Sequence, residues 1–164
     1  MRVGLIPGQV NQQLTRYQRL NRVHCTPFFR NTLGIIILRT TTLHPMKAIN
    51  LHQKFGLFED QWSPKIIAQL NGQDVKLAKI EGSFVWHAHE EQDELFHVIR
   101  GRMTMEFRDQ SVEVEPGEII VVPRGVEHRP VAQEEVWILL FEPHDTAHTG
   151  GVEDPRAVDH FPHI

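Results

Sequence analysis

The sequence predicts an all-β fold, and two observations carry that prediction. Short runs rich in β-branched and aromatic residues recur from Trp62 onward, and turn signals containing Gly or Pro separate them. No stretch with the apolar period of a helix lies between these runs. Roughly nine strands at this spacing indicate a sandwich or a barrel. The 164 residues are enough for one domain with a sizeable core and too few for two ordinary domains.

The strands follow from the turns that bound them. Asn71-Gly72 lies between two apolar runs and is a strong hairpin signal, because glycine supplies the positive φ of a tight turn. Pro116-Gly117 and Pro123-Arg124-Gly125 bound later runs, since proline presets φ for a turn. The expected strands are residues 64–70, 74–80, 83–87, 94–99, 102–107, 111–115, 118–122, 127–132 and 135–142.

These strands place the expected barrel at residues 62–145, after a lead-in segment at residues 46–61. Residues 146–164 form a C-terminal tail, for which fraying is the default. His144 and His148 lie near the start of this tail. They could cap the mouth of the barrel, but we favour a surface loop.

The first 45 residues differ in composition from the rest of the chain. They hold six arginines and no acidic residue, whereas residues 46–164 hold the other 11 basic residues and all 21 acidic ones. The segment could be a basic arm for nucleic acid or membrane, an Arg-rich transit peptide, or a stretch that is not translated because synthesis starts at Met46. We favour the third interpretation and expect a poorly structured extension wherever it is present. An intact mass that includes residues 1–45 in the natural protein would contradict it.

Composition also excludes several classes of protein. The net charge of −4 does not suit a nucleic-acid binder. The longest apolar run, residues 33–38, is far shorter than the roughly 20 residues of a membrane-spanning helix. We therefore expect a soluble, cytoplasmic protein that binds neither nucleic acid nor membrane. Its one cysteine, Cys25, excludes an intrachain disulfide framework and a cysteine-rich zinc site.

Two segments carry side chains suited to a metal ion. Residues two apart on a strand point to the same face, so His87 and His89 project together, about 6–7 Å apart at their backbones. Glu94 begins the strand after the next polar turn. His128 opens a later strand and can point back into the barrel. Asp93 competes with Glu94 for the carboxylate role, but the spacing and the position at the strand start favour Glu94.

The same residues resemble the two motifs of the cupin superfamily. The first motif matches at Gly82, His87, His89, Glu94 and Gly101. Four residues separate His89 from Glu94, and six separate Glu94 from Gly101. The gap of four residues between Gly82 and His87 is one shorter than in the commonest form.

The second motif matches at Gly117, Pro123, Gly125 and His128. Ala132 stands where this motif ends in asparagine. That asparagine does not bind metal in the family, so its absence leaves the expected metal ligands unchanged. The 15 residues 102–116 separate the two motifs, and the resemblance covers about residues 62–145.

The resemblance implies a small single-domain cupin, a double-stranded β-helix or jelly-roll barrel that is often a homodimer. It also implies one divalent transition metal held by His87, His89, Glu94 and His128. Imidazole and carboxylate ligands suit Fe, Mn, Ni, Cu or Zn better than Ca or Mg, but they do not choose among the former. Four protein ligands in an octahedral shell leave two positions for water, substrate or oxygen.

Five further residues are candidates for a substrate pocket. Phe96 and Val98 share the strand face of Glu94, and Met103 and Met105 alternate on the next strand. Ordinary core packing is the competing role for most of them. Lys79 shares an apolar strand face, where it could bind a carboxylate or phosphate of a substrate or extend to solvent.

Three functions remain open for such a chain. The first is a metal-dependent enzyme on a small polar molecule, similar to the mannose-6-phosphate-isomerase-like small cupins. The second is a non-haem iron dioxygenase, whose pocket would need apolar walls. The third is a non-catalytic module that binds a small ligand. No separate catalytic base is evident, so the sequence leaves open whether the protein is an enzyme.

Overall fold

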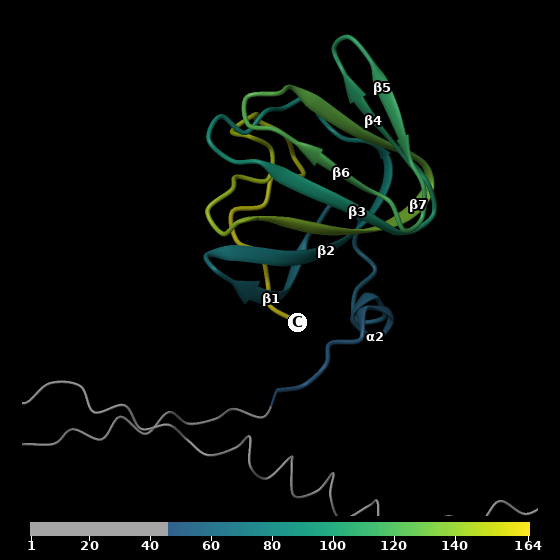
Figure 1. The fold of residues 1–164 in the computed structure, drawn as a ribbon, viewed down its shortest axis with the longest axis vertical. Coiled ribbons are helices and arrows are strands. Elements are labelled where there is room, and N and C mark those ends of the chain that lie inside the picture. The colour runs from purple at the N-terminus through teal and green to yellow at the C-terminus, as the bar shows by residue number, and fades with distance from the viewer. Residues whose placement is uncertain (1–45) are drawn as a thin grey trace, which may run out of the picture. The chain divides into compact units, whose positions relative to one another are not determined.

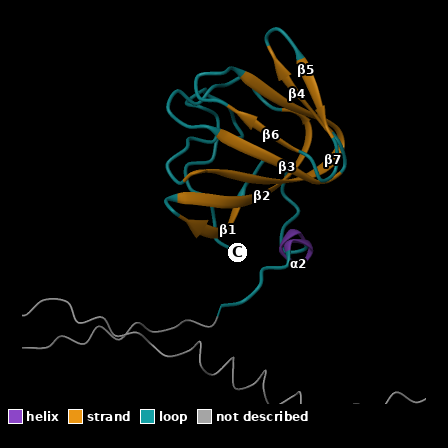
Figure 2. Ribbon diagram, in the orientation of Figure 1, coloured by secondary structure: helices purple, strands orange, loops and turns teal. Residues whose placement is uncertain are grey.

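The computed structural model describes residues 46–164, and the expectations for residues 1–45 lie outside these described residues. A short helix, α2 (Leu51–Phe55), precedes the strands of the described part, which curl into a barrel (Figures 1 and 2). The strands are β1 (Lys65–Leu70), β2 (Gln73–Ser83), β3 (Glu94–Arg100), β4 (Met103–Phe107), β5 (Ser111–Val114), β6 (Ile119–Val122) and β7 (His128–Pro143). Residues 46–164 contain no helix that is long and apolar enough to cross a membrane.

The strand pairing is antiparallel and centres on β7. The sheet has the order β1-β2-β7-β3-β6, and β4 pairs with both β5 and β7. The C-terminal half of β7 lies between β2 and β3, whereas its first residues pair with β4. One long strand thus joins both parts of the barrel. The all-β jelly-roll fold predicted from the sequence is confirmed.

Two details of the expected strands are wrong. Residues 127–132 and 135–142 are one strand, β7, because the exposed Gln133 and Glu134 continue it rather than turn it. Residues 84–87 are not a strand. A β-bulge between Ile80 and Gly82 bends the end of β2, and the chain then continues into the loop of residues 84–93, where an isolated bridge pairs His87 with His128.

The two faces of β2 are buried against different partners. Ala78 and Ile80 face the interior of the barrel and belong to its main apolar cluster. Leu77 faces the other way and packs with Phe55 and Trp137 in a second cluster. The Asn50 side chain caps α2 by accepting a hydrogen bond from the Gln53 backbone N–H at 3.1 Å. This cap places Phe55 at the end of α2 over the outer face of β2.

The C-terminal residues pack on the barrel instead of fraying. The backbone N–H of Ile66 in β1 donates to the Pro162 carbonyl at 2.9 Å, and the Ile164 N–H donates to the Ile66 carbonyl at 3.1 Å. Thr146 and Thr149 are buried, and their hydroxyls donate to backbone carbonyls within the same segment. The chain end therefore returns to lie beside β1 (Figure 1).

Candidate metal centre

Four buried side chains from three separate segments meet inside the barrel. Glu94 begins β3, His128 begins β7, and His87 and His89 lie on the loop after β2. One potential ligand atom from each side chain lies within 4.8 Å of the ligand atoms of the other three. The His87–His128 bridge, with backbone hydrogen bonds of 3.1 and 2.9 Å, holds the loop against β7. The four residues expected to bind a metal are therefore brought together.

Backbone carbonyls orient two of the imidazoles. Nδ1 of His87 lies 3.0 Å from the Val85 carbonyl, and Nδ1 of His128 lies 3.0 Å from the Val126 carbonyl. A carbonyl only accepts, so each Nδ1 carries the proton and donates it. Each Nε2 is then left as a free lone pair directed at the centre of the group, which is the arrangement a metal ligand requires.

Burial and mutual charge shape the electrostatics of the group. Burial, followed by repulsion from His128, lowers the pKa of His87 to about 4. Burial alone would raise the pKa of Glu94, but contacts with His128 and His89 outweigh it and hold this pKa at about 2. At neutral pH the group therefore presents a neutral imidazole at His87 and a carboxylate at Glu94, the forms that bind a cation.

The group fits a metal because three of its atoms have no other partner. Nε2 of His89, Nε2 of His128 and Oε2 of Glu94 are buried and make no hydrogen bond within the described chain. Oε2 lies 3.2 Å from the first nitrogen and 3.4 Å from the second. Such unpartnered polar atoms are costly unless something binds them. A transition metal with bonds of about 2.0–2.2 Å would satisfy all of them at once.

Asp93, the competing carboxylate, is turned away from this group. It is exposed, and its Oδ1 accepts a hydrogen bond from the backbone N–H of Arg124 at 2.9 Å. That hydrogen bond and the Arg124 guanidinium lower the pKa of Asp93. Asp93 therefore ties two loops together at the surface and leaves the interior position to Glu94.

Comparison with known proteins identifies the family. The sequence profile described as a cupin domain matches residues 73–141. The uncharacterized protein YdbB of Bacillus subtilis (strain 168) is 32% identical over 89 residues, which make up 54% of this chain and 78% of that protein. The chain belongs to the cupin family.

Two solved structures are similar to this cupin. A cupin-2 domain containing protein from Shewanella frigidimarina NCIMB 400 is 48% identical, covers 58% of this chain and 94% of its own, and gives a TM-score of 0.58. Protein NMB1881 from Neisseria meningitidis is 33% identical, covers 59% of this chain and 99% of its own, and gives a TM-score of 0.55. The resemblance to small cupins predicted from the two motifs is confirmed.

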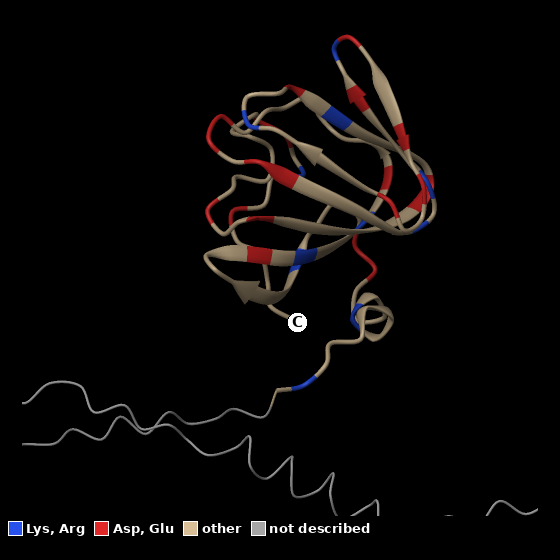
Figure 3. Ribbon diagram, viewed as in Figure 1, with Lys and Arg blue, Asp and Glu red and all other residues tan. Residues whose placement is uncertain are grey.

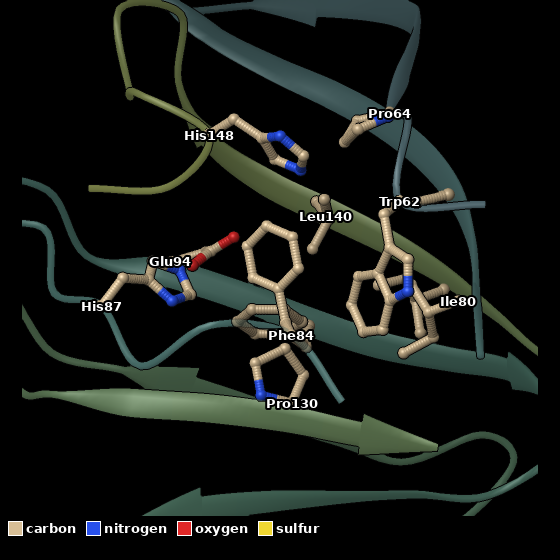
Figure 4. Close-up of a pocket in the computed structure, with 12 residues that line it drawn as sticks. Trp62, Pro64, Ile80, Phe84, His87, Glu94, Pro130, Leu140 and His148 are labelled. Carbon is tan, nitrogen blue, oxygen red and sulfur yellow. The ribbon is translucent and has the colours of Figure 1, made fainter. Parts of the chain in front are cut away.

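A small cavity lies beside the four side chains, and its walls are apolar. Its volume is about 30 Å³, and Figure 4 shows the aromatic rings that surround it. His87, Glu94 and His148 are its ionisable lining residues. The apolar lining comes from Trp62, Pro64, Ala78, Ile80, Phe84, Phe96, Pro130, Ile138 and Leu140. The cupin site thus combines one polar end with an apolar chamber.

The candidate pocket residues fall into three groups. Phe96 lines the cavity. Val98, Met103 and Met105 are almost completely buried in the main apolar cluster and lie outside the lining of the cavity. Lys79 lies on the outer face of β2, where its Nζ is 3.0 Å from Glu59 and 5.5 Å from the centre of the Trp137 ring. Because Lys79 alternates with Ala78 and Ile80, its side chain points away from the cavity, and the pocket role expected for it is not supported.

Trp62, Phe84 and His148 line the cavity although no motif pointed to them. The indole of Trp62 stacks on Phe84 with ring centres 4.8 Å apart, and its Nε1 donates to the Glu81 carbonyl at 2.8 Å. Trp62 has a φ of 56°, a left-handed backbone that is uncommon outside glycine.

The surface loop expected at His148 is wrong, because the packed C-terminal segment brings this side chain against Phe84. Its isolated position in the sequence carries no signal for such a contact.

A second buried polar group lies inside the barrel. Nζ of Lys76 is 2.9 Å from Glu142 and 3.8 Å from Asp74, and all three side chains are buried. Acidic and basic positions accordingly lie side by side along β2 (Figure 3). Burial, followed by the charge of Glu94, raises the pKa of Glu142 to about 8, and Lys76 opposes this rise without cancelling it. This group has internal partners, in contrast to the atoms of the metal centre.

Proposed function

We propose that this cupin holds one divalent transition metal through His87, His89, Glu94 and His128. The proposal is supported by the convergence of four buried ligand atoms within 4.8 Å and by three buried polar atoms of this group that have no hydrogen-bond partner within residues 46–164. A metal in this position would act as a Lewis acid and would keep open positions for water, dioxygen or an oxygen atom of a substrate.

We further propose that the protein is a metal-dependent enzyme that acts on a small, largely apolar compound carrying an oxygen function. The observation that carries this proposal is the lining of the cavity, which is apolar and includes no lysine or arginine among its described residues. Of the reaction classes open to such a site, a non-haem iron dioxygenase fits best, because dioxygen is small and apolar and partitions into a dry, apolar chamber.

The residues of the chain would have distinct roles in such a reaction. Trp62 and Phe84 would exclude water from the chamber, whose volume of about 30 Å³ admits dioxygen or the reacting end of a substrate. The carboxylate of Glu94 and the imidazoles orient whatever binds at the polar end. A sugar phosphate is a poorer fit, because a phosphate normally binds to cationic side chains or helix N-termini, and Lys79 faces away from the cavity.

Metal analysis combined with oxygen uptake tests the proposed function. The protein is purified without a chelator or affinity tag, its metals are measured, and it is then loaded with Fe(II) under anaerobic conditions. A simple β-diketone, a simple phenol and mannose 6-phosphate are offered to it in separate oxygen-electrode experiments. We expect oxygen uptake that depends on one of the first two compounds.

Three other outcomes would contradict parts of the proposal. Conversion of mannose 6-phosphate to a ketose phosphate, followed by product analysis in the absence of oxygen, would favour the isomerase. Thermal stabilisation by a compound without any turnover would favour a binding module. A protein that takes up no transition metal would overturn the proposed metal site itself.

We also propose that the cupin forms a homodimer through the edge of its sheet. Among the described strands, β6 pairs only with β3, which leaves its other edge open. Ile119 and Val121 on this strand are 59% and 51% exposed, an unusual state for large apolar side chains on a sheet edge. Sedimentation equilibrium should give a dimer that the double variant Ile119→Glu, Val121→Glu converts to a monomer. Leu57→Glu serves as the exposed control, and a monomeric wild type would contradict the proposal.

A further inference from the structure

Two cavities lie on either side of one histidine. The inner cavity beside the metal ligands has a volume of about 30 Å³, and an outer cavity beneath the C-terminal segment has a volume of about 660 Å³. His148 is the one residue common to the linings of both. The inner cavity has room for only about one or two water molecules. The outer cavity falls in the range of about 300–1,000 Å³ that is typical of small-molecule sites.

Contacts on both faces hold the His148 ring between these cavities. Its centre lies 5.0 Å from that of Phe84, which lines the inner cavity, and 5.9 Å from that of Phe161, which lines the outer one. Nδ1 lies 3.1 Å from the Arg156 carbonyl and donates to it. In Figure 4 the imidazole of His148 points from the C-terminal segment toward Leu140 and Pro64.

The backbone that carries His148 is fastened more firmly than its side chain. Gly150 packs so closely on the loop between the ligands His87 and His89 that an added Cβ would lie 2.2 Å from the Ala88 carbonyl oxygen. Arg156 donates to the Ser83 carbonyl at 2.7 Å and pairs with Asp154. Rotation of the His148 ring would therefore open a passage more readily than displacement of the whole segment.

We infer that His148 is a specificity-determining residue that sets the size of the molecule able to reach the metal ligands. In its described position the ring stands between the inner and outer cavities, and rotation of the ring would join them. The inference rests on the proposed metal site. The outer cavity has no lysine or arginine among its lining residues and includes Asp74, Asp145, Glu153 and Asp159. The passage accordingly suits neutral or cationic compounds rather than anions.

The rate at which a chelator strips the metal tests this inference. The full-length protein is loaded with zinc, an excess of the neutral chelator 1,10-phenanthroline is added, and the zinc that stays on the protein is measured over time in desalted aliquots. His148→Ala removes both ring contacts, so we expect about tenfold faster release at unchanged zinc stoichiometry. His148→Phe keeps the ring and should release zinc as the wild type does, whereas His148→Trp should slow release. His160→Ala is the control, because His160 lines only the outer cavity.

Each alternative result has a definite meaning. Release from His148→Ala at the wild-type rate would overturn the inference and leave the metal site standing. A fall in zinc stoichiometry in both His148→Ala and His148→Phe would make His148 a ligand instead. A wild type that binds no zinc or other transition metal would overturn the proposed function. If the alanine variant fails to fold, His148→Trp tests the inference, because release at the wild-type rate from that variant would overturn it.

Discussion

Two groups of ionisable side chains are buried inside the barrel, and they differ in whether their polar atoms have partners. In the group around Lys76, the cation lies 2.9 Å from Glu142 and 3.8 Å from Asp74, and Gln69 donates to Asp74 at 2.8 Å. In the group around Glu94, three buried atoms have no hydrogen-bond partner in the described chain. The first group is paired by its own side chains, whereas the second leaves these three atoms available to a cation.

This difference predicts that one group contributes to the stability of the barrel and the other to its proposed function. A self-paired group contributes to the unique packing of the barrel, and its loss should affect folding alone. An unpartnered group costs free energy until it binds its ligand, so its loss should abolish binding. Variants in each group therefore test whether the two are as distinct as the contacts indicate.

The largest effect is expected from His128→Ala. Loss of this ligand should abolish stoichiometric metal binding and with it the stabilisation by metal, which reaches about 4 kcal/mol when free metal is a thousandfold above its Kd. Metal analysis and thermal unfolding with and without metal provide the measurement. His97→Ala is the matched control, because His97 alternates with Glu94 on β3 and faces the other way. Metal retained by His128→Ala with an unchanged Tm would contradict the assignment.

The metal-free protein should lose stability toward acid because of the histidines. The folded pKa of His87, about 4, lies below its ordinary value of 6.5, so only the unfolded chain takes up this proton between those values. The free energy of unfolding should fall by up to about 3 kcal/mol as pH drops from 6.5 to 4. His148, whose pKa burial also lowers, adds to this loss.

Glu142 should act in the opposite direction. Because burial raises its pKa from 4.5 to about 8, its contribution is complete below pH 4.5 and is lost as pH rises through 8. Urea unfolding of Glu142→Gln should therefore remove the decline above pH 6.5 and steepen the net decline below it. An unchanged profile in this variant would refute the role given to Glu142.

A moderate effect is expected from Lys76→Met. The substitution leaves Glu142 and Asp74 buried without their cation, which should cost about 2 kcal/mol of folding free energy. The cost should be smaller at pH 6 than at pH 8, because Glu142 can then accept a proton. Metal stoichiometry should not change, and a variant that folded normally but lost its metal would show that the two groups are coupled.

The smallest effect is expected from Lys79→Met on the outer face of β2. Lys79 pairs with Glu59, whose side chain is 86% exposed, and such half-exposed pairs contribute only about 0.5 kcal/mol. Methionine keeps the packing of the long side chain against Phe58 and Trp137. Neither metal content nor turnover should change. A selective loss of turnover would show that Lys79 contributes to the site after all.

The sequence predicted the parts of the site that depend on local spacing. Strand alternation and turn chemistry placed Glu94 at the start of a strand and His128 after a Pro-Gly turn, and both positions are found. The strand expected at residues 83–87 is a loop, yet His87 and His89 still face the same centre, because the bridge to His128 holds this loop in an extended form. The positions of the two histidines were therefore predicted correctly, although the secondary structure predicted around them was wrong.

What the sequence could not supply were contacts between segments distant along the chain. Lys76 and Lys79 lie three residues apart on β2, and only the position of the sheet within the barrel shows that one faces Glu142 and the other Glu59. In the same way, His148 looks like a surface residue until the segment that carries it packs against Ala88 and Ser83.

The amino-acid sequence by itself determined the all-β fold, the cupin family and the four convergent candidate ligands, because period-two alternation and turn residues act over a few positions. Only the tertiary structure decided which side chains line the cavity, that its walls are apolar, and that a histidine from the C-terminal segment stands at its edge. Those features arise when strands far apart in the chain close into one barrel, and no local pattern encodes that closure.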